Sequence, residues 1–282
     1  MRFYKYCGAG NDFVLVENFD GALASAHYSE LARRLCDRHF SVGADGLMIL
    51  EPPTDGGDCK LAFFNNDGSS AEMCGNGARC VCRHCFDRGL SGAEQRIETA
   101  AGLVTGRRVS EENYRIRLND PSAFRPLPRG LTPSAGSTAG EKAAASVFRP
   151  LEYMELGENG IPHGVVLVDM SEDRAILRDF ARELRRHPAF PKGMNVNLCA
   201  VTAENTVRLL TYERGVEDFT LACGTGNGAA VCALSRAGLV SGRATRVVND
   251  GGIMTVDVTP EGLYLTGPAL RTFVGELPER GG

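Results

Sequence analysis

The sequence lacks any apolar run near the ~20 residues that a bilayer-spanning helix requires. It also lacks an excess of positive charge, since 31 basic residues face 35 acidic ones and the net charge is −4. That balance argues against a nucleic-acid partner and against a basic membrane-binding face. The first residues, MRFYKYCG, contain no hydrophobic segment of the kind that a secretory signal needs. We therefore expect a cytoplasmic protein with neither nucleic acid nor membrane as a partner.

The length and composition indicate a globular chain of two domains. There are 282 residues, of which 43% are hydrophobic and 23% charged, and a domain typically takes about 150 residues. Ten cysteines are present. Without a route of export, they are expected to be reduced thiols and not a disulfide framework.

An internal repeat divides the chain into halves. Residues 71–78 read AEMCGNGA, and residues 221–229 read LACGTGNGA, which places the two cysteines 149 positions apart. Other landmarks keep nearly the same offset: Val14-Leu15-Val16 matches Val166-Leu167-Val168, and TAAG at 99–102 falls opposite NDGG at 249–252. Three landmarks in one register predict two halves of the same architecture.

Hydrophobic periodicity predicts the same order of elements in both halves. Helices are expected at about 28–38 and 75–88, and again at 172–186 and 224–238. Strands are expected at about 13–18, 47–51, 60–65, 96–99, 103–109 and 114–118, then at 164–170, 195–201, 206–213, 243–249, 253–258 and 263–267. The predicted domains are 1–120 and 121–267, and the segment 126–146, rich in Pro, Gly, Ser, Thr and Ala, is expected to be a mobile linker.

Each repeated motif places a cysteine directly before a Gly-x-Gly turn that opens a helical pattern. The first N–H groups of a helix have no internal partner and form an anion site, and a cysteine at that position has a lowered pKa. Cys74 and Cys223 therefore predict an acid–base thiol beside a carboxylate-binding turn, present twice. One such cysteine alone would more simply be a small buried residue at a tight turn. Two in matching registers favour chemistry.

Two symmetric thiols indicate inversion of a stereocentre, because this reaction needs a base on one face of a carbon and an acid on the other. Thiols that share a site titrate as a coupled pair, which favours one thiolate with one thiol. A different class of protein, a redox sensor or metal-binding module, would instead use Cys74 and Cys223 as a disulfide or bind a metal. The spacing of Cys80, Cys82 and Cys85 suggests zinc ligands. No suitably spaced second pair lies nearby, so packing in a buried helix is the favoured interpretation.

Seven motifs spread over nearly the whole chain, apart from residues 126–146, point to a known family. They are GNDF at 10–13, DRH at 37–39, GADG at 43–46, NDGS at 66–69, CGNGARC at 74–80, YERG at 212–215 and ACGTG at 222–226. As a set they resemble the diaminopimelate epimerase family. The resemblance implies an isomerase that interconverts LL- and meso-2,6-diaminopimelate in lysine and peptidoglycan precursor synthesis, with no cofactor and with Cys74 and Cys223 as the two catalytic bases.

The resemblance also implies the fold and the substrate contacts. The fold is α+β, with two pseudo-symmetric domains that each wrap a β-barrel-like mixed sheet around a central helix, and with a return strand at 268–282 that joins the first domain. Family members often form homodimers. The helix starts are implied to hold the carboxylate of the reacting centre through Gly75, Asn76, Gly224 and Thr225. The other implied substrate contacts are Asn11, Asn65, Asn195, Glu213 and Arg214.

Three positions need separate comment. His163 alone would predict a loop histidine, whereas the resemblance implies that it orients or tunes a thiol. Ile161 lies where many relatives have an asparagine that contacts substrate. Phe219 lies in the stretch Asp218-Phe219-Thr220, where many relatives have Gly-Glu-Thr. A related alternative keeps the mechanism but takes a proline-like or other amino acid. Arg214 and Glu213 favour a substrate with a second charged end.

Overall fold

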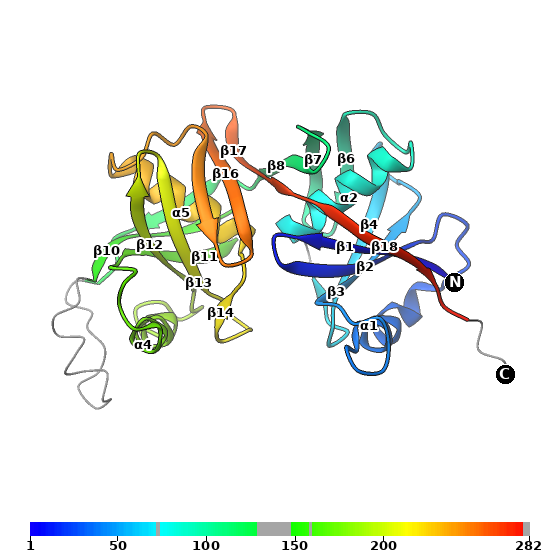
Figure 1. The fold of residues 1–282 in the computed structure, drawn as a ribbon, viewed down its shortest axis with the longest axis horizontal. Helices are drawn as coiled ribbons and strands as arrows, with labels where there is room; N and C mark the ends of the chain where they lie inside the picture. The colour runs from blue at the N-terminus through cyan, green and yellow to red at the C-terminus, as the bar shows by residue number, and fades with distance from the viewer. Residues whose placement is uncertain (72–73, 129–147, 158–159, 279–282) are drawn as a thin grey trace. The chain divides into compact units, whose positions relative to one another are not determined.

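The computed structural model describes residues 1–71, 74–128, 148–157 and 160–278 (Figure 1). The chain divides into two compact units, Met1–Arg117 with Thr266–Gly282, and Leu118–Leu265. Most of the expected linker at 126–146 lies outside the described residues. Within the described ranges, every helix is too short or too polar to span a lipid bilayer.

The first unit is a mixed sheet. Its elements are β1 (Arg2–Gly8), β2 (Asn11–Glu17), the 3-10 turn η1 (Ser25–His27), α1 (Tyr28–Cys36), β3 (Gly46–Glu51), β4 (Cys59–Asn65), β5 (Ser70–Ala71), α2 (Gly75–Asp87), β6 (Glu94–Thr99), β7 (Gly102–Arg108), β8 (Asn113–Leu118) and, from the end of the chain, β18 (Leu270–Glu276). β2 and β3 are parallel neighbours, and the chain between them forms α1. β4 and β6 are likewise parallel, and the chain between them includes α2. The other pairings are antiparallel, including β1 with both β2 and β18.

The second unit repeats this connectivity. Its elements are β9 (Pro121–Arg125), β10 (Arg149–Leu156), β11 (Ile161–Leu167), α4 (Arg174–Arg185), β12 (Asn195–Ala203), β13 (Thr206–Tyr212), β14 (Phe219–Thr220), α5 (Gly224–Arg236), β15 (Thr245–Asn249), β16 (Gly252–Thr259) and β17 (Gly262–Pro268). β11 and β12 run parallel across α4, and β13 and β15 run parallel across α5. Parallel neighbours need such crossovers, because a tight turn cannot join them.

The helices are of two kinds, which follow from their sequences. In α1 and α4 the buried residues recur every three or four positions, as at Ile176, Phe180 and Leu184, so each helix covers its sheet with one apolar face. In α5 nearly every residue from Gly226 to Leu234 is buried. Apart from Asn227, this stretch consists of Gly, Ala, Val, Cys and Leu, so it can be buried all round, and α5 contacts β10, β11, β12, β13 and β16. Figure 1 shows α2 and α5 each surrounded by the strands of its own unit. The predicted α+β fold with two similar halves is confirmed at the level of connectivity.

The expected strands correspond to β2–β4, β6–β8, β11–β13 and β15–β17, and three strands of five residues or more were missed, namely β1, β9 and β10. β18 lies within 268–282, where the family resemblance, and not the hydrophobic pattern, implied a return strand. β18 pairs with β1 from Arg2↔Glu276 to Cys7↔Leu270, so its partner comes from the other end of the chain. Its side chains, including Phe273 and Val274, are largely exposed. A strand without a buried face has no alternating pattern to reveal it.

Candidate active site

In the first unit, Cys74 is the N-cap residue of α2, directly before Gly75. Its backbone is extended, and its carbonyl accepts the N–H of Ala78 at 2.7 Å, the first bond of the helix. The first turn is closely packed. A Cβ on Gly77 would lie 3.6 Å from the Cβ of Cys74 and 3.3 Å from the sulfur of Met48, and a Cβ on Gly8 would lie 2.8 Å from the Asn76 carbonyl oxygen. Cys74 is half-buried, so its thiol is at the margin of the packed interior.

A chain of hydrogen bonds leads from this turn to the sheet. The amide of Asn76 donates to Oδ1 of Asn11 at 2.5 Å, and the amide of Asn11 donates to Oδ2 of Asp45 at 3.1 Å. On the other side, Nη2 of Arg79 donates to Oδ1 of Asn76 at 2.8 Å. Two of the predicted substrate contacts, Asn11 and Asn76, therefore contact each other beside Cys74.

Arg79 is a residue whose importance the sequence analysis missed. Its side chain is fully buried, and its other hydrogen bonds go to the carbonyl oxygens of Gly75 and Pro268. Among the described residues, no carboxylate pairs with it. A buried cation without a counter-ion is costly, and this one lies at the first turn after the cysteine. The CGNGAR motif carried the signal, but an arginine on a helix is ordinarily a solvated side chain.

Asn65 lies at the end of the first sheet where β2 and β3 begin, which is also the end that carries Asn11. It ends β4 opposite Gly46, the first residue of β3, which in turn pairs with Phe13 of β2. Its amide donates to the hydroxyl of Ser69 at 2.9 Å, which fixes the turn that follows. The strand register thus brings Asn65 to the sheet end that also carries Asn11.

A cluster of ion pairs joins the residues next to Asn11 at this end of the sheet. Asp12 accepts hydrogen bonds from Lys5 at 2.7 Å and from Arg38 at 2.6 Å, and Arg38 also bonds Asp45. Burial by itself would raise the pKa of Asp12, but the hydrogen bonds from Arg38 and Lys5 outweigh it and hold this pKa at about 2. Asp12 is therefore a charged anchor for the loop that carries Asp45.

In the second unit, Cys223 is the N-cap residue of α5 and has the same extended backbone that Cys74 has at α2. Its sulfur accepts the N–H of Gly226 at 3.4 Å and lies 3.4 Å from the hydroxyl of Thr225. Its carbonyl accepts the N–H and the side-chain amide of Asn227, at 3.0 and 2.6 Å. The sulfur is thus held at the positive end of the helix, where negative charge is favoured.

Three further predicted residues meet near one strand end. Oδ1 of Asn195 accepts the backbone N–H of Arg214 at 2.8 Å. Glu213 is half-buried, and its Oε2 accepts the hydroxyl of Thr220 at 2.9 Å. Burial raises the pKa of Glu213, against the opposing effect of that hydrogen bond. The Arg214 guanidinium is exposed and donates to the Lys192 carbonyl at 3.1 Å. Glu213 and Arg214 therefore place a carboxylate and a guanidinium on adjacent residues.

His163 pairs in register with Asn195, one strand away. The imidazole is fully buried, and burial, with a smaller effect of the Arg214 charge, lowers its pKa to about 3. Its Nδ1 lies 3.2 Å from the amide nitrogen of Asn197. Asn197 was missed by the sequence analysis, because an asparagine inside a strand pattern carries no signal of its own.

The two departures from the family pattern differ in their surroundings. Phe219 packs against the buried core of the second unit, edge-on to Tyr212, and the guanidinium of Arg174 lies 5.3 Å from its ring centre. Ile161 begins β11 and is 37% exposed. The aromatic ring therefore has a packing role, whereas the side chain of Ile161 is open to solvent.

The remaining helix cysteines pack inside the first unit. Cys80, Cys82 and Cys85 are fully buried, and Cys85 lies 3.5 Å, sulfur to sulfur, from Cys59 of β4. Burial raises the pKa of Cys80 and Cys82, so both stay thiols. In the described ranges, no group of three or more His, Cys, Asp or Glu side chains is arranged to hold a metal ion.

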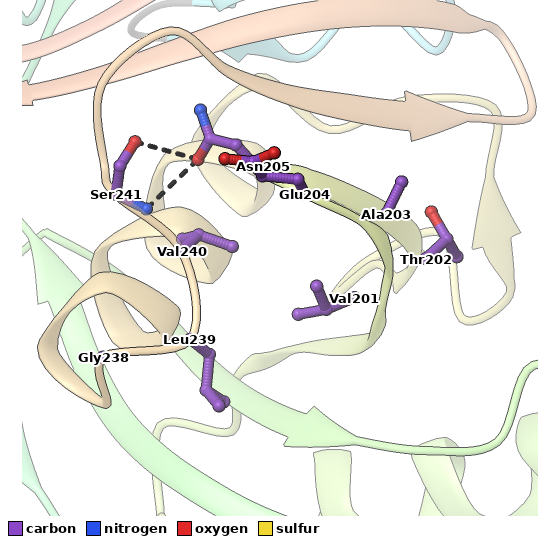
Figure 2. Close-up of a pocket in the computed structure, with 9 residues that line it drawn as sticks. All are labelled: Val201, Thr202, Ala203, Glu204, Asn205, Gly238, Leu239, Val240 and Ser241. Atoms are coloured by element: carbon purple, nitrogen blue, oxygen red, sulfur yellow. Dashed lines mark hydrogen bonds between the residues drawn. The ribbon is translucent and has the colours of Figure 1, made fainter.

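A surface hollow of the second unit lies away from these residues. Figure 2 shows it between the β12–β13 turn, which contains Asn205, and the segment from Gly238 to Ser241 that follows α5. Oδ1 of Asn205 accepts the backbone N–H and the hydroxyl of Ser241, at 3.1 and 2.9 Å. Since α5 has 13 residues and a helix rises 1.5 Å per residue, the hollow is about 20 Å from Cys223.

The chain matches known proteins over both units. The family model described as diaminopimelate epimerase matches residues 3–120 and 157–272. A diaminopimelate epimerase of Aquifex aeolicus is 36% identical, covering 99% of this chain and 98% of its own length, and one of Archaeoglobus fulgidus is 37% identical, covering 98% and 96%. A solved PhzF-family phenazine biosynthesis protein of Bacillus anthracis shares the fold, with a TM-score of 0.71, 16% identity and 99% coverage of both chains.

The repeated fold, with a cysteine at the start of each central helix, and these relatives together define an amino-acid epimerase, which is an isomerase. The chain belongs to the diaminopimelate epimerase family. Its substrate is accordingly a small molecule of the amino-acid class.

Proposed function

We propose that this protein interconverts LL- and meso-2,6-diaminopimelate without a cofactor, by proton transfer between Cys74 and Cys223. One thiolate removes the α-proton, and the thiol of the other cysteine returns a proton to the opposite face of the carbon. Each turnover leaves the two cysteines with their protonation exchanged, so the reaction runs in both directions. The observation that carries this proposal is the sulfur of Cys223, held by the N–H of Gly226 at a helix start, with Cys74 in the matching place on α2.

The substrate contacts follow from the charges of diaminopimelate, which has a carboxylate and an ammonium at each end. The N–H groups after each cysteine suit the carboxylate of the reacting centre. Arg214 can bind the distal carboxylate through two parallel hydrogen bonds, and Glu213 can bind an ammonium. The paired donors and acceptors of Asn11, Asn65 and Asn195 suit a substrate with both charges.

The experiment uses purified protein with LL-diaminopimelate in deuterated water and no added cofactor. Deuterium is expected at the α-carbon, together with the meso isomer. If neither forms, the proposal is wrong. A monocarboxylic amino acid serves as the control substrate, and its racemisation at comparable kcat/KM would assign the mechanism to a different substrate.

A further inference from the structure

A buried side-chain network fixes the state of His163. Three polar side chains with almost no exposure, His163, Asn197 and Thr211, lie on the adjacent strands β11, β12 and β13. The hydroxyl of Thr211 donates to Oδ1 of Asn197 at 3.0 Å. The amide nitrogen of Asn197 lies 3.1 Å from the Gly164 carbonyl oxygen and 3.2 Å from Nδ1 of His163.

The orientation of the Asn197 amide follows from its partners. A backbone carbonyl can only accept a hydrogen bond, so the atom of Asn197 that faces Gly164 must be the NH2 group. The NH2 group has two protons. One goes to Gly164, and the other points at Nδ1 of His163.

The protonation state of His163 follows in turn. An Nδ1 that accepts a proton from an amide cannot carry one itself, so the single proton of a neutral imidazole must be on Nε2. Nε2 is buried and has no hydrogen-bond partner among the described residues. This N–H is therefore a donor that no described residue accepts.

The network also reaches the turn that holds Cys223. A Cβ on Gly226 would lie 2.5 Å from Oδ1 of Asn197, 2.8 Å from the hydroxyl of Thr211 and 3.2 Å from the Cβ of Cys223. The amide of Asn197 is therefore packed against the same glycine whose N–H bonds the sulfur of Cys223. Asn197 therefore has two roles: it determines which nitrogen of His163 carries the proton, and it packs against the turn that holds Cys223.

The charged and titratable groups around the imidazole are few. The neighbouring strands place Met154 and Asn195 opposite His163 in register, and neither titrates. α5 packs against β11 and carries Cys223, Cys232 and Arg236. The charge that acts on the imidazole is that of Arg214, which disfavours a second cation beside it.

We propose that Asn197 is a positioning residue that holds His163 as the neutral Nε2–H tautomer, so that Nε2 serves only as a hydrogen-bond donor beside the Cys223 turn. In this state His163 can stabilise negative charge on a substrate carboxylate or a thiolate, and it cannot act as the base. The kinetic consequence rests on the proposed two-cysteine function. The tautomer itself does not.

The first test is nuclear magnetic resonance of the full chain labelled with 15N-histidine. The chain has five histidines, and the His163→Gln variant assigns the signals of this one. Long-range proton–nitrogen correlations should show a proton on Nε2 and none on Nδ1 from pH 5 to 9. A proton on Nδ1, or a titration midpoint near the ordinary value of about 6.5, would overturn the proposal. This readout needs no turnover, so it stays decisive if diaminopimelate proves not to be the substrate.

The second test is Asn197→Asp, which keeps the shape but replaces the donor with an acceptor. The carboxylate should draw a proton to Nδ1, so that Nε2 carries a proton only while the imidazole is charged. The kcat of this variant should therefore fall as the pH rises, by about 10- to 100-fold relative to the unsubstituted enzyme at pH 8, with a smaller change in KM. A uniform loss of activity at every pH would show a structural role only.

The matched control is Asn18→Asp in the first unit. Asn18 is also a buried asparagine, and it donates to the Leu23 carbonyl and the Tyr28 hydroxyl. Asn18→Asp introduces the same buried carboxylate without contacting the His163 network. It should lower stability and leave the His163 signals and the shape of the pH profile unchanged. If Asn197→Asp does not fold, the tautomer of the unsubstituted chain still decides the proposal.

Discussion

Arg79 donates a 2.8 Å hydrogen bond to Oδ1 of Asn76 while its guanidinium is completely buried at the start of α2. The repeat places Gly228 of α5 at the equivalent position, five residues after Cys223. The two similar halves therefore differ in the charge beside their cysteines. A positive charge in a site of low polarity stabilises a nearby thiolate.

We predict that Arg79→Met raises the pH at which Cys74 becomes reactive by about one unit, equivalent to about 1.4 kcal/mol. The measurement is the pH dependence of alkylation at each cysteine, read by peptide mass spectrometry. The midpoint of Cys223 in the same sample is the internal control. An unchanged midpoint at Cys74 in folded Arg79→Met would show that the guanidinium has no electrostatic effect there.

Replacing either proposed base should separate proton removal from inversion. Cys74→Ala and Cys223→Ala are each expected to lose at least about 100-fold in turnover, because general acid–base groups contribute that much or more. Each variant should still exchange the α-proton of the one isomer that faces its remaining thiol. Cys36→Ala is the control, since burial raises the pKa of Cys36 to about 12 and keeps it a thiol. Full turnover by either variant would refute the two-base mechanism.

Glu213→Gln should weaken substrate binding more than it slows the reaction. The substitution keeps the size of the side chain and its bond to Thr220 but removes the charge proposed to bind an ammonium. A rise in KM of about tenfold or more is expected, with a smaller change in kcat. Glu217→Gln is the control, because Glu217 pairs with Arg185 and Arg186, and such pairs contribute little. Equal effects of both variants on KM would contradict the assignment.

The stability of the first unit should fall in acid as Asp12 takes up a proton. Its folded pKa of about 2 lies below the ordinary value of about 3.9. The folded state therefore binds this proton less readily than the unfolded state. The stabilisation, up to about 2 kcal/mol, is complete above about pH 5 and is lost progressively between about pH 5 and pH 1. Urea unfolding across this range should show a shallower pH dependence for Asp12→Asn. Asp20→Asn, on an exposed loop, should match the unsubstituted chain.

Two helix glycines should respond differently to alanine. In an open helix this change stabilises by up to about 1 kcal/mol. At Gly226 the new methyl group would meet Asn197 and Thr211 at 2.5 and 2.8 Å, and overpacking of this kind costs about 1–3 kcal/mol. At Gly77 the nearest atom is the sulfur of Met48 at 3.3 Å, on a flexible side chain. Thermal unfolding should show Gly226→Ala clearly destabilised and Gly77→Ala close to unchanged. The reverse order would contradict the packing described at the Cys223 turn.

Most long strands and the helices α1 and α4 could be predicted from the sequence, because each has one buried face and therefore a periodic pattern. α5 is buried all round, and the repeated cysteine motif before it gave its position instead. The pattern did not reveal β18, which only the family resemblance implied, since its side chains are mostly exposed and its partner β1 comes from the other end of the chain. Asn11 and Asn76 were named as separate contacts. Only the folded chain shows that they bond each other, across 65 residues of sequence.

The amino-acid sequence alone determined the duplication, the two cysteines before their Gly-x-Gly turns and the family, because these depend on residue identity and spacing. Tertiary structure decided that Arg79 is buried and that Asn197 bonds His163. The physical reason is that strand register and burial choose which polar groups meet away from water. There most polar groups find a partner in the protein, and a single carbonyl, that of Gly164, determines the position of a proton on an imidazole two contacts away.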